Sequence, residues 1–190
     1  MTVITAYLRR RAVAYAEHWA LSRNPLFYDF TGSGGDCTNF VSQCILAGCC
    51  TMNFTPTFGW YFRTSSDRAP AWTSVEYLYD FLTGAPDFAR ENGGIGPFGR
   101  EVPAPLARVG DVVQLADETG DFYHTLLVTA TGPEGLLVSA HTNDALNRPL
   151  SSYDYATARC IHIVGVRTEY PDTTCYRDLI DGVALPDQTN

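Results

Sequence analysis

The pattern of hydrophobic and polar positions divides the chain into a helical first half and a strand-rich second half. In residues 2–23, apolar side chains recur at helical spacing with arginines on the other side, which predicts an amphipathic helix ending just before Pro25. A second apolar-periodic run predicts a buried helix over residues 37–47 that stops at Gly48. A shorter helix is expected over residues 74–82.

In the second half of the chain the hydrophobic period changes to two. Four strands are predicted, with glycine-containing turns between several of them: 111–115, 123–131, 135–141 and 160–167. Three segments are expected to be irregular loops: 26–36, 49–73 and 84–106. Helices followed by strands predict an α+β protein in which N-terminal helices pack on an antiparallel sheet. We expect a single domain over residues 1–170 and a polar, loosely docked C-terminal tail over residues 171–190.

Composition agrees with a folded domain and narrows the range of partners. The chain has 190 residues, of which 45% are hydrophobic and 13% aromatic, so it can bury a sizeable core. Its net charge is −8, and this acidity disfavours nucleic acid and anionic membranes as partners. No apolar run approaches the roughly 20 residues that span a bilayer. The arginines at positions 9–11 follow the apolar N-terminal residues, whereas in a signal peptide the charges come first, so the sequence by itself favours a cytoplasmic location. The oligomeric state stays open.

The six cysteines do not form a metal-binding pattern, because no CxxC pair occurs, and we expect neither a metal nor a cofactor. Four of them lie close together in the sequence: Cys37, Cys44, Cys49 and Cys50. Cys37 and Cys44 are two turns apart on one predicted helix, too far to form a disulfide. The crowding favours mostly reduced cysteines and leaves open whether any disulfide forms.

Cys37 is the most informative residue of the chain. It follows the glycines of the sequence GGDCTNFVSQ (residues 34–43) and starts an apolar-periodic run. At the first turn of a helix, unpaired backbone N–H groups and the helix dipole stabilise a thiolate. In such a position the pKa of a cysteine falls from about 8.5 to roughly 3.5–7.5. The sequence therefore predicts a nucleophile, and hence an enzyme.

A nucleophilic thiol requires a base, and the base requires a residue that orients it. Two of the four histidines, His18 and His162, fall within a helix and a strand, where a structural role is expected. His124 begins a predicted strand, where a side chain can point into a cleft, and it is the predicted base. Three residues at the end of the next strand compete for the orienting role: His141, Asn143 and Asp144.

Four segments together resemble the bacterial putative amidase-domain family: 34–43, 110–114, 123–125 and 141–150. That family is similar to the NlpC/P60 and CHAP cysteine peptidases, which share a papain-like core. The resemblance implies a papain-like fold, Cys37 as nucleophile, His124 as general base and a polar third residue on the next strand, where His141 stands. It also implies action on amide bonds of cell-wall peptides or γ-glutamyl substrates, and a location in the cell envelope or outside the cell. The expected partner is therefore a peptide or a peptidoglycan fragment.

Further residues near Cys37 are candidates for contact with the substrate. They are polar or aromatic: Asp36, Tyr28, Asn39, Gln43, Trp60 and Asp144. The backbone N–H of Cys37 is expected to receive the developing oxyanion together with Asn39, Gln43 or Tyr28. Tyr28, Trp60 and Tyr61 are candidates for lining the cleft, and Asp36 is expected to cap the second helix.

Two other functions compete with hydrolysis. Acyl transfer would use the same Cys37 and His124, with an amine in place of water. A non-catalytic binding module would use the aromatic loop at residues 54–72 as its contact surface. The presence of both Cys37 and His124 favours an enzyme, because a binding module needs neither.

Overall fold

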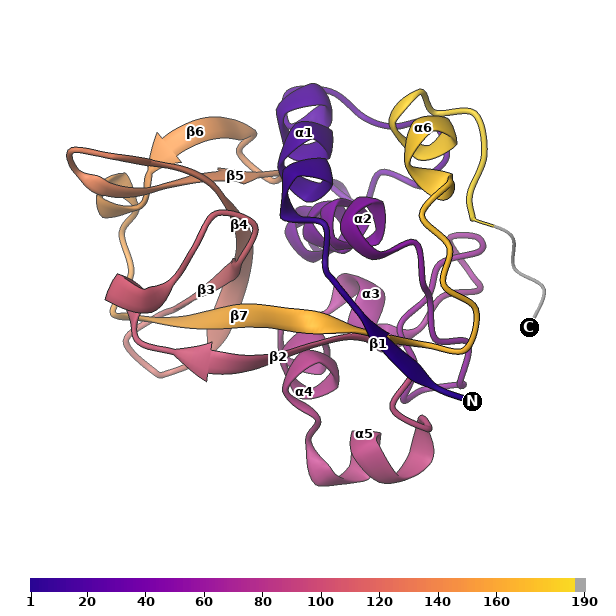
Figure 1. The fold of residues 1–190 in the computed structure, drawn as a ribbon. Coiled ribbons are helices and arrows are strands. Elements are labelled where there is room, and N and C mark those ends of the chain that lie inside the picture. Colours follow the sequence, from indigo (N-terminus) through magenta and orange to yellow (C-terminus); the bar gives the residue numbers. More distant parts are fainter. Residues whose placement is uncertain (187–190) are drawn as a thin grey trace.

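A computed structural model describes residues 1–186 and contains a seven-stranded antiparallel sheet with helices packed around one part of it (Figure 1). The strands are β1 (Val3–Thr5), β2 (Gly96–Val102), β3 (Val112–Ala116), β4 (Phe122–Gly132), β5 (Gly135–Ala140), β6 (Ala145–Pro149) and β7 (Thr157–Thr168). Their order is β1-β7-β3-β4-β5-β6, and β2 also pairs with β7. The expected α+β class and the antiparallel sheet are confirmed.

Helices lie on both sides of the long strand β7 in Figure 1. They are α1 (Arg9–Trp19), α2 (Cys37–Cys49), α3 (Pro70–Thr73), α4 (Val75–Thr83), α5 (Pro86–Glu91) and α6 (Cys175–Ile180), with short 3-10 helices η1 (Ala104–Leu106) and η2 (Leu150–Ser152). α1 contacts α2 and α6, while α4 contacts β2, β4 and β7. None of the helices in residues 1–186 is long and apolar enough to cross a membrane.

The first predicted helix is shorter than expected, because the chain begins with a strand. Residues 3–5 pair with β7, with Val3 opposite Thr168 and Thr5 opposite Val166, and α1 starts only at Arg9. A local hydrophobic pattern cannot reveal this pairing, since the partner strand lies at the other end of the chain.

Part of the region predicted as irregular also forms regular structure. Residues 84–106 contain α5 and β2, and β2 pairs with β7 from Gly96 opposite Arg167 to Val102 opposite Cys160. The register shifts between Phe98 and Gly99, which is typical of a β-bulge and explains a glycine-rich strand. Strand β6 was also missed.

Alternation along the sheet separates two buried cores. Val112 and Leu127 pack with the helices, whereas Val113 and Leu126 pack with the second core under β5 and η2. Every residue of α2 is buried. The helix that begins with Cys37 is therefore held between α1 and β4.

The C-terminal segment is attached more firmly than the sequence indicated. Cys175, at the start of α6, forms a disulfide with Cys50, directly after α2. Trp19 Nε1 also donates to the carbonyl of Ile180 at 3.0 Å. The expectation of a loosely docked tail is therefore wrong for residues 175–180, and residues 187–190 lie outside the described residues. Four cysteines remain free: Cys37, Cys44, Cys49 and Cys160.

Candidate active site

Cys37 is the first residue of α2, and its thiol lies against β4. Its side chain is free of disulfides and the residue is 7% exposed. The sulfur lies 3.8 Å from Thr38 Oγ1, which in turn lies 2.9 Å from Thr125 Oγ1. The backbone of Thr125 also forms a hydrogen bond with the sulfur. The thiol therefore contacts the peptide unit that joins Thr125 to His124.

The electrostatics of Cys37 differ from the sequence-based expectation. Burial raises the pKa of the Cys37 thiol, and hydrogen bonds from Thr125, Thr38 and the backbone of Cys37 itself only partly oppose this rise. The amides at the helix start act in the predicted direction, but removal of the sulfur from water outweighs them. The prediction of a thiol with a lowered pKa is therefore wrong. Cys37 is therefore a neutral thiol, which would need a base in order to act as a nucleophile.

His124 is a neutral imidazole near the start of β4. Burial, together with the positive charge of Arg148, lowers the pKa of His124 to about 4. The ring lies 6.0 Å from the ring of Tyr153, on the face away from α2, whereas Thr125 faces α2. Within residues 1–186 no hydrogen bond joins His124 to Cys37. The two groups lie on either side of one peptide unit, and His124 is in the protonation state of a base.

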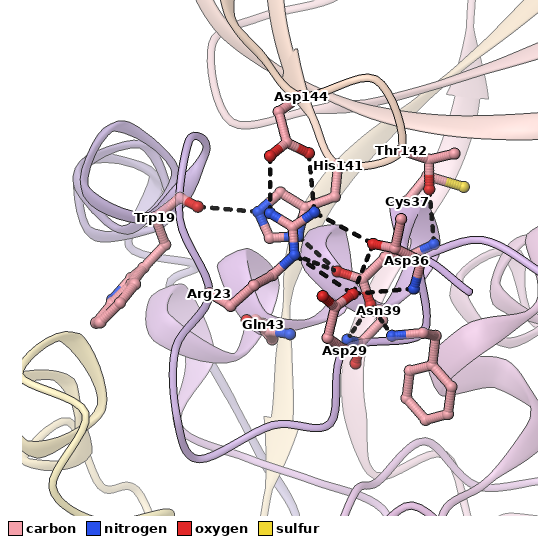
Figure 2. A network of polar contacts seen from close by, with 12 residues as sticks. Trp19, Arg23, Asp29, Asp36, Cys37, Asn39, Gln43, His141, Thr142 and Asp144 are labelled. Atoms are coloured by element: carbon pink, nitrogen blue, oxygen red, sulfur yellow. Dashed lines mark hydrogen bonds and ion pairs between the residues drawn. The ribbon is translucent and has the colours of Figure 1, made fainter. Parts of the chain in front are cut away.

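His141 directly follows β5, the strand next to β4, but it does not orient His124. Its Nδ1 lies 2.6 Å from Asp36 Oδ2, and its Nε2 lies 2.9 Å from the carbonyl oxygen of Trp19 (Figure 2). Its ring also stacks on Phe40, with 4.1 Å between ring centroids. Because both ring nitrogens are engaged, the predicted orienting role does not fit this geometry. His141 instead supports the start of α2.

Asp36 is fully buried and its carboxylate is completely engaged inside the protein. Oδ1 accepts hydrogen bonds from the backbone of Phe30 at 2.9 Å and from Asn39 Nδ2 at 2.7 Å. Its own backbone N–H donates to Thr142 Oγ1 at 2.7 Å. The side chain makes no capping bond to α2. Asp36 therefore occupies the predicted N-cap position without a capping side-chain bond, and it is not accessible to a substrate.

The two remaining candidates for the orienting role lie in the turn between β5 and β6. Asp144 accepts two hydrogen bonds from Arg23, each 2.9 Å long (Figure 2). Asn143 is exposed, and its φ of 68° is a left-handed conformation that asparagine tolerates better than most residues. In residues 1–186 neither side chain is hydrogen-bonded to His124.

Three other predicted substrate contacts belong to the protein interior. Asn39 Oδ1 accepts a hydrogen bond from Trp72 Nε1 at 2.9 Å, and Gln43 Oε1 accepts one from the hydroxyl of Tyr15 at 2.8 Å. Trp60 is completely buried. Because these side chains already have internal partners or no exposure, they do not line a cleft. Short polar spacing in the sequence could not distinguish an internal hydrogen bond from a substrate contact.

Tyr28 is the aromatic candidate that remains at the surface, with half of its area exposed. Its carbonyl accepts a hydrogen bond from Asn39 Nδ2 at 3.0 Å, and its ring packs edge-on against Phe30. It therefore stays a candidate for contact with the substrate. Most of the aromatic segment at residues 54–72 faces inward: Trp60, Tyr61, Phe62 and Trp72 are buried. This packing contradicts the use of that segment as an aromatic binding surface.

Sequence reasoning missed the residues that surround His124. Arg148 Cζ lies 4.0 Å above the ring of Tyr153, and Arg148 Nε donates to Ser152 Oγ at 2.8 Å. The Tyr153 hydroxyl is buried and has no hydrogen-bond partner in residues 1–186. Arg148 lies in one of the segments that carry the family resemblance, but its separation from His124 in the sequence concealed their proximity.

Comparison with known proteins shows the family of the chain. Residues 6–164 match the family described as "Putative amidase domain". The chain belongs to this family. A relative of this amidase domain, described as "Uncharacterized protein YhbB" of Bacillus subtilis (strain 168), is 33% identical over 156 residues, which cover 80% of the chain and 46% of the relative. The chain thus spans about half the length of that relative. No solved structure matches the amidase domain. At a coarse level, membership of the family indicates an amide hydrolase.

Proposed function

We propose that this amidase domain is a cysteine-dependent amide hydrolase in which Cys37 is the nucleophile and His124 the general base. The observation that carries the proposal is the position of the Cys37 sulfur, at the start of a helix and against the peptide unit that joins His124 to Thr125. The other free thiols are less suited to attack. Burial raises the pKa of Cys49 to about 12 and that of Cys160 to about 11, and Cys44 is fully buried.

The resting protonation states decide the first step. The Cys37 thiol transfers its proton to the neutral His124 as its sulfur bonds to the carbonyl carbon of the substrate. Because the ring lies beside Tyr153 and no hydrogen bond joins it to Cys37 in residues 1–186, this transfer requires the imidazole to turn towards the sulfur when substrate binds. Catalytic hydrogen bonds often form fully only in the complex with substrate. The backbone N–H of Cys37 donates to the oxyanion that forms, and the hydroxyl of Tyr28 is the candidate second donor.

The remaining steps return both groups to their starting states. Protonated His124 gives its proton to the leaving amine, the C–N bond breaks, and the acyl group remains on Cys37 as a thioester. A water molecule then attacks the thioester while His124 takes up its proton. Collapse of the second tetrahedral intermediate releases the carboxylic acid and restores the thiol and the neutral imidazole.

The proposed substrates are amides of cell-wall peptides or of γ-glutamyl peptides. The family and the resemblance to cell-wall peptidases support this class. The Cys50–Cys175 disulfide supports a location in an oxidising compartment, such as the cell envelope or the exterior, because structural disulfides are rare in reducing cytosol. In this location the protein would have access to cell-wall peptides.

The test is incubation of the purified protein with a panel of muropeptides and γ-glutamyl peptides, with products identified by mass spectrometry. Cys37→Ala is expected to abolish hydrolysis and leave the thermal midpoint nearly unchanged. Cys49→Ala is the matched control, because it removes another buried thiol of α2 and is expected to retain activity. Equal turnover by Cys37→Ala would overturn the assignment. Adding an amine acceptor to the same assay separates hydrolysis from acyl transfer.

A further inference from the structure

The hydrogen bonds around His141 fix the number of protons that it shares with Asp36. The carbonyl of Trp19 can only accept a hydrogen bond, so His141 Nε2, 2.9 Å away, carries a hydrogen. His141 Nδ1 lies 2.6 Å from Asp36 Oδ2 (Figure 2). A bare nitrogen and a bare carboxylate oxygen would place two lone pairs face to face at this distance. A proton therefore lies between them, whether it is assigned to the imidazole or to the carboxyl group.

We propose that Asp36 and His141 share one proton as a net-neutral pair. This pair positions Cys37, and it neutralises the carboxylate charge that would otherwise lie close to the Cys37 sulfur. Asp36 directly precedes Cys37 in the chain, and both residues are buried. A lone carboxylate so close to the thiol would oppose formation of the thiolate. The role in catalysis rests on the proposed function of Cys37, whereas the shared proton does not.

The neighbouring charges do not replace the proton on His141. Arg23 Nε lies 3.6 Å from Asp36 Oδ2, but the terminal nitrogens of Arg23 bind both oxygens of Asp144 at 2.9 Å (Figure 2). Arg23 Nε is also 3.4 Å from Asp29. The single positive charge of Arg23 thus faces three carboxylates and cannot balance the negative charge of Asp36 by itself. The charge of Asp36 is therefore balanced by the proton that it shares with His141.

The turn after β5 makes the arrangement one unit. His141 engages the Asp36 side chain, Thr142 accepts from the Asp36 backbone, and Asp144 holds Arg23. The ring of His141 is also fixed by its stack on Phe40 in α2. Residues 141–144, the segment predicted to orient the base, thereby hold the nucleophile.

Nuclear magnetic resonance of histidine-labelled protein tests the shared proton without any need for activity. In the unmodified protein we expect a far-downfield proton resonance on His141 Nδ1 and a hydrogen on Nε2. In Asp36→Asn we expect the downfield resonance to disappear and a neutral ring protonated at Nε2. Absence of a far-downfield proton resonance between His141 Nδ1 and the Asp36 carboxyl group in the unmodified protein, whichever of the two groups carries the proton, would overturn the proposal.

Site-resolved alkylation of Cys37 by iodoacetamide, followed against pH, tests the effect on the nucleophile. Asp36→Asn is expected to react within about threefold of the unmodified rate, because an amide retains the bonds to Phe30 and Asn39 and donates to a neutral His141. His141→Ala leaves Asp36 charged, so the rate at neutral pH is expected to fall by at least about tenfold, as for a thiol whose pKa rises by one unit. The double variant Asp36→Asn/His141→Ala is expected to recover reactivity.

The matched control is His162→Ala, which removes a histidine placed 2.9 Å from another buried aspartate, Asp111. It is expected to leave the alkylation profile of Cys37 unchanged. Loss of reactivity in Asp36→Asn equal to that in His141→Ala would contradict the neutral pair, as would a double variant no better than His141→Ala. If His141→Ala does not fold, the resonance experiment still decides. Absence of amide hydrolysis with a confirmed shared proton would reject only the proposed function.

Discussion

At the scale of single residues, burial rather than residue type sets the chemistry of the site. Cys37 and His124 both lose most of their contact with water, and each is driven towards its neutral form: the pKa of the thiol rises and that of the imidazole falls. A neutral thiol beside a neutral base favours activation at the moment of attack over a preformed thiolate–imidazolium pair.

The pH dependence of hydrolysis follows from the charge next to His124. Below its pKa of about 4 the imidazole is protonated and cannot act as a base, so kcat/KM is expected to fall as the pH drops through this value. Arg148→Gln removes a positive charge that disfavours the imidazolium. The pKa of His124 is then expected to rise, and the acid limb of the profile to move to higher pH.

The control for Arg148→Gln is Arg90→Gln, which removes an exposed guanidinium on α5 that pairs with Asp87 and Glu91. It is expected to leave the acid limb in place. An acid limb that stays at the same pH in Arg148→Gln would show that this arginine does not act on the base.

The sequence predicted the positions of Cys37 and His124 in the fold but not the arrangement of their neighbours. The local pattern predicted Cys37 at a helix start and His124 at a strand start. In the structure the Cys37 sulfur contacts the peptide unit that joins His124 to Thr125. The side chains of Asp36, Asn39 and Gln43 were misjudged because a polar residue near a nucleophile looks the same in sequence whether it faces substrate or an internal partner.

At the scale of elements, α2 is longer than predicted because a glycine inside it serves packing instead of ending the helix. A Cβ on Gly48 would overlap with the ring of Tyr7, and the helix continues to Cys49 before Cys50 adopts a left-handed conformation with φ of 52°. Glycine usually marks a helix end, so the pattern predicted a helix that ends at residue 47, two residues before its observed end at Cys49.

The replacement Gly48→Ala tests this interpretation. Alanine is the better helix former by about 1 kcal/mol, yet the clash with Tyr7 is expected to destabilise the protein by about 1–3 kcal/mol. Chemical denaturation measures the change. The control is Gly32→Ala, because a Cβ there meets no atom within 4 Å and the change in stability should be small. A Gly48→Ala variant that is more stable than the unmodified protein would contradict the packing role.

Most central elements were predictable, and those at the edges of the sheet were not. β3, β4, β5 and β7 carry their own alternation of apolar residues, so local pattern suffices. β1 has only three residues and β2 is rich in glycine, and both are strands because β7 offers them hydrogen-bonding partners. Such pairing depends on contacts far apart in the sequence.

At the scale of the whole molecule, the disulfide between Cys50 and Cys175 connects positions 125 residues apart. Closing a long loop restricts the unfolded chain, and reduction is expected to lower the free energy of unfolding by about 2–4 kcal/mol. The thermal midpoint measured with and without reductant checks this. In the variant Cys50→Ala/Cys175→Ala, reductant is expected to have no further effect.

Thiol counting provides a second measurement of the same bond. Denatured, unreduced protein is expected to take up four iodoacetamide groups, matching the four free cysteines, and reduced protein six. Uptake of six groups without reductant would contradict the disulfide.

Helix α2 is fastened at both ends, by the turn at residues 141–144 at its start and by the bond from Cys50 to α6 beyond its end. In the loop that leads into it, Thr31 accepts a hydrogen bond from Arg23 of this attachment, whereas residues 32–34 are exposed. New substrate preferences can therefore be sought by diversifying residues 32–34 in a combinatorial library, since these exposed positions lie outside the side-chain contacts that hold the start of α2.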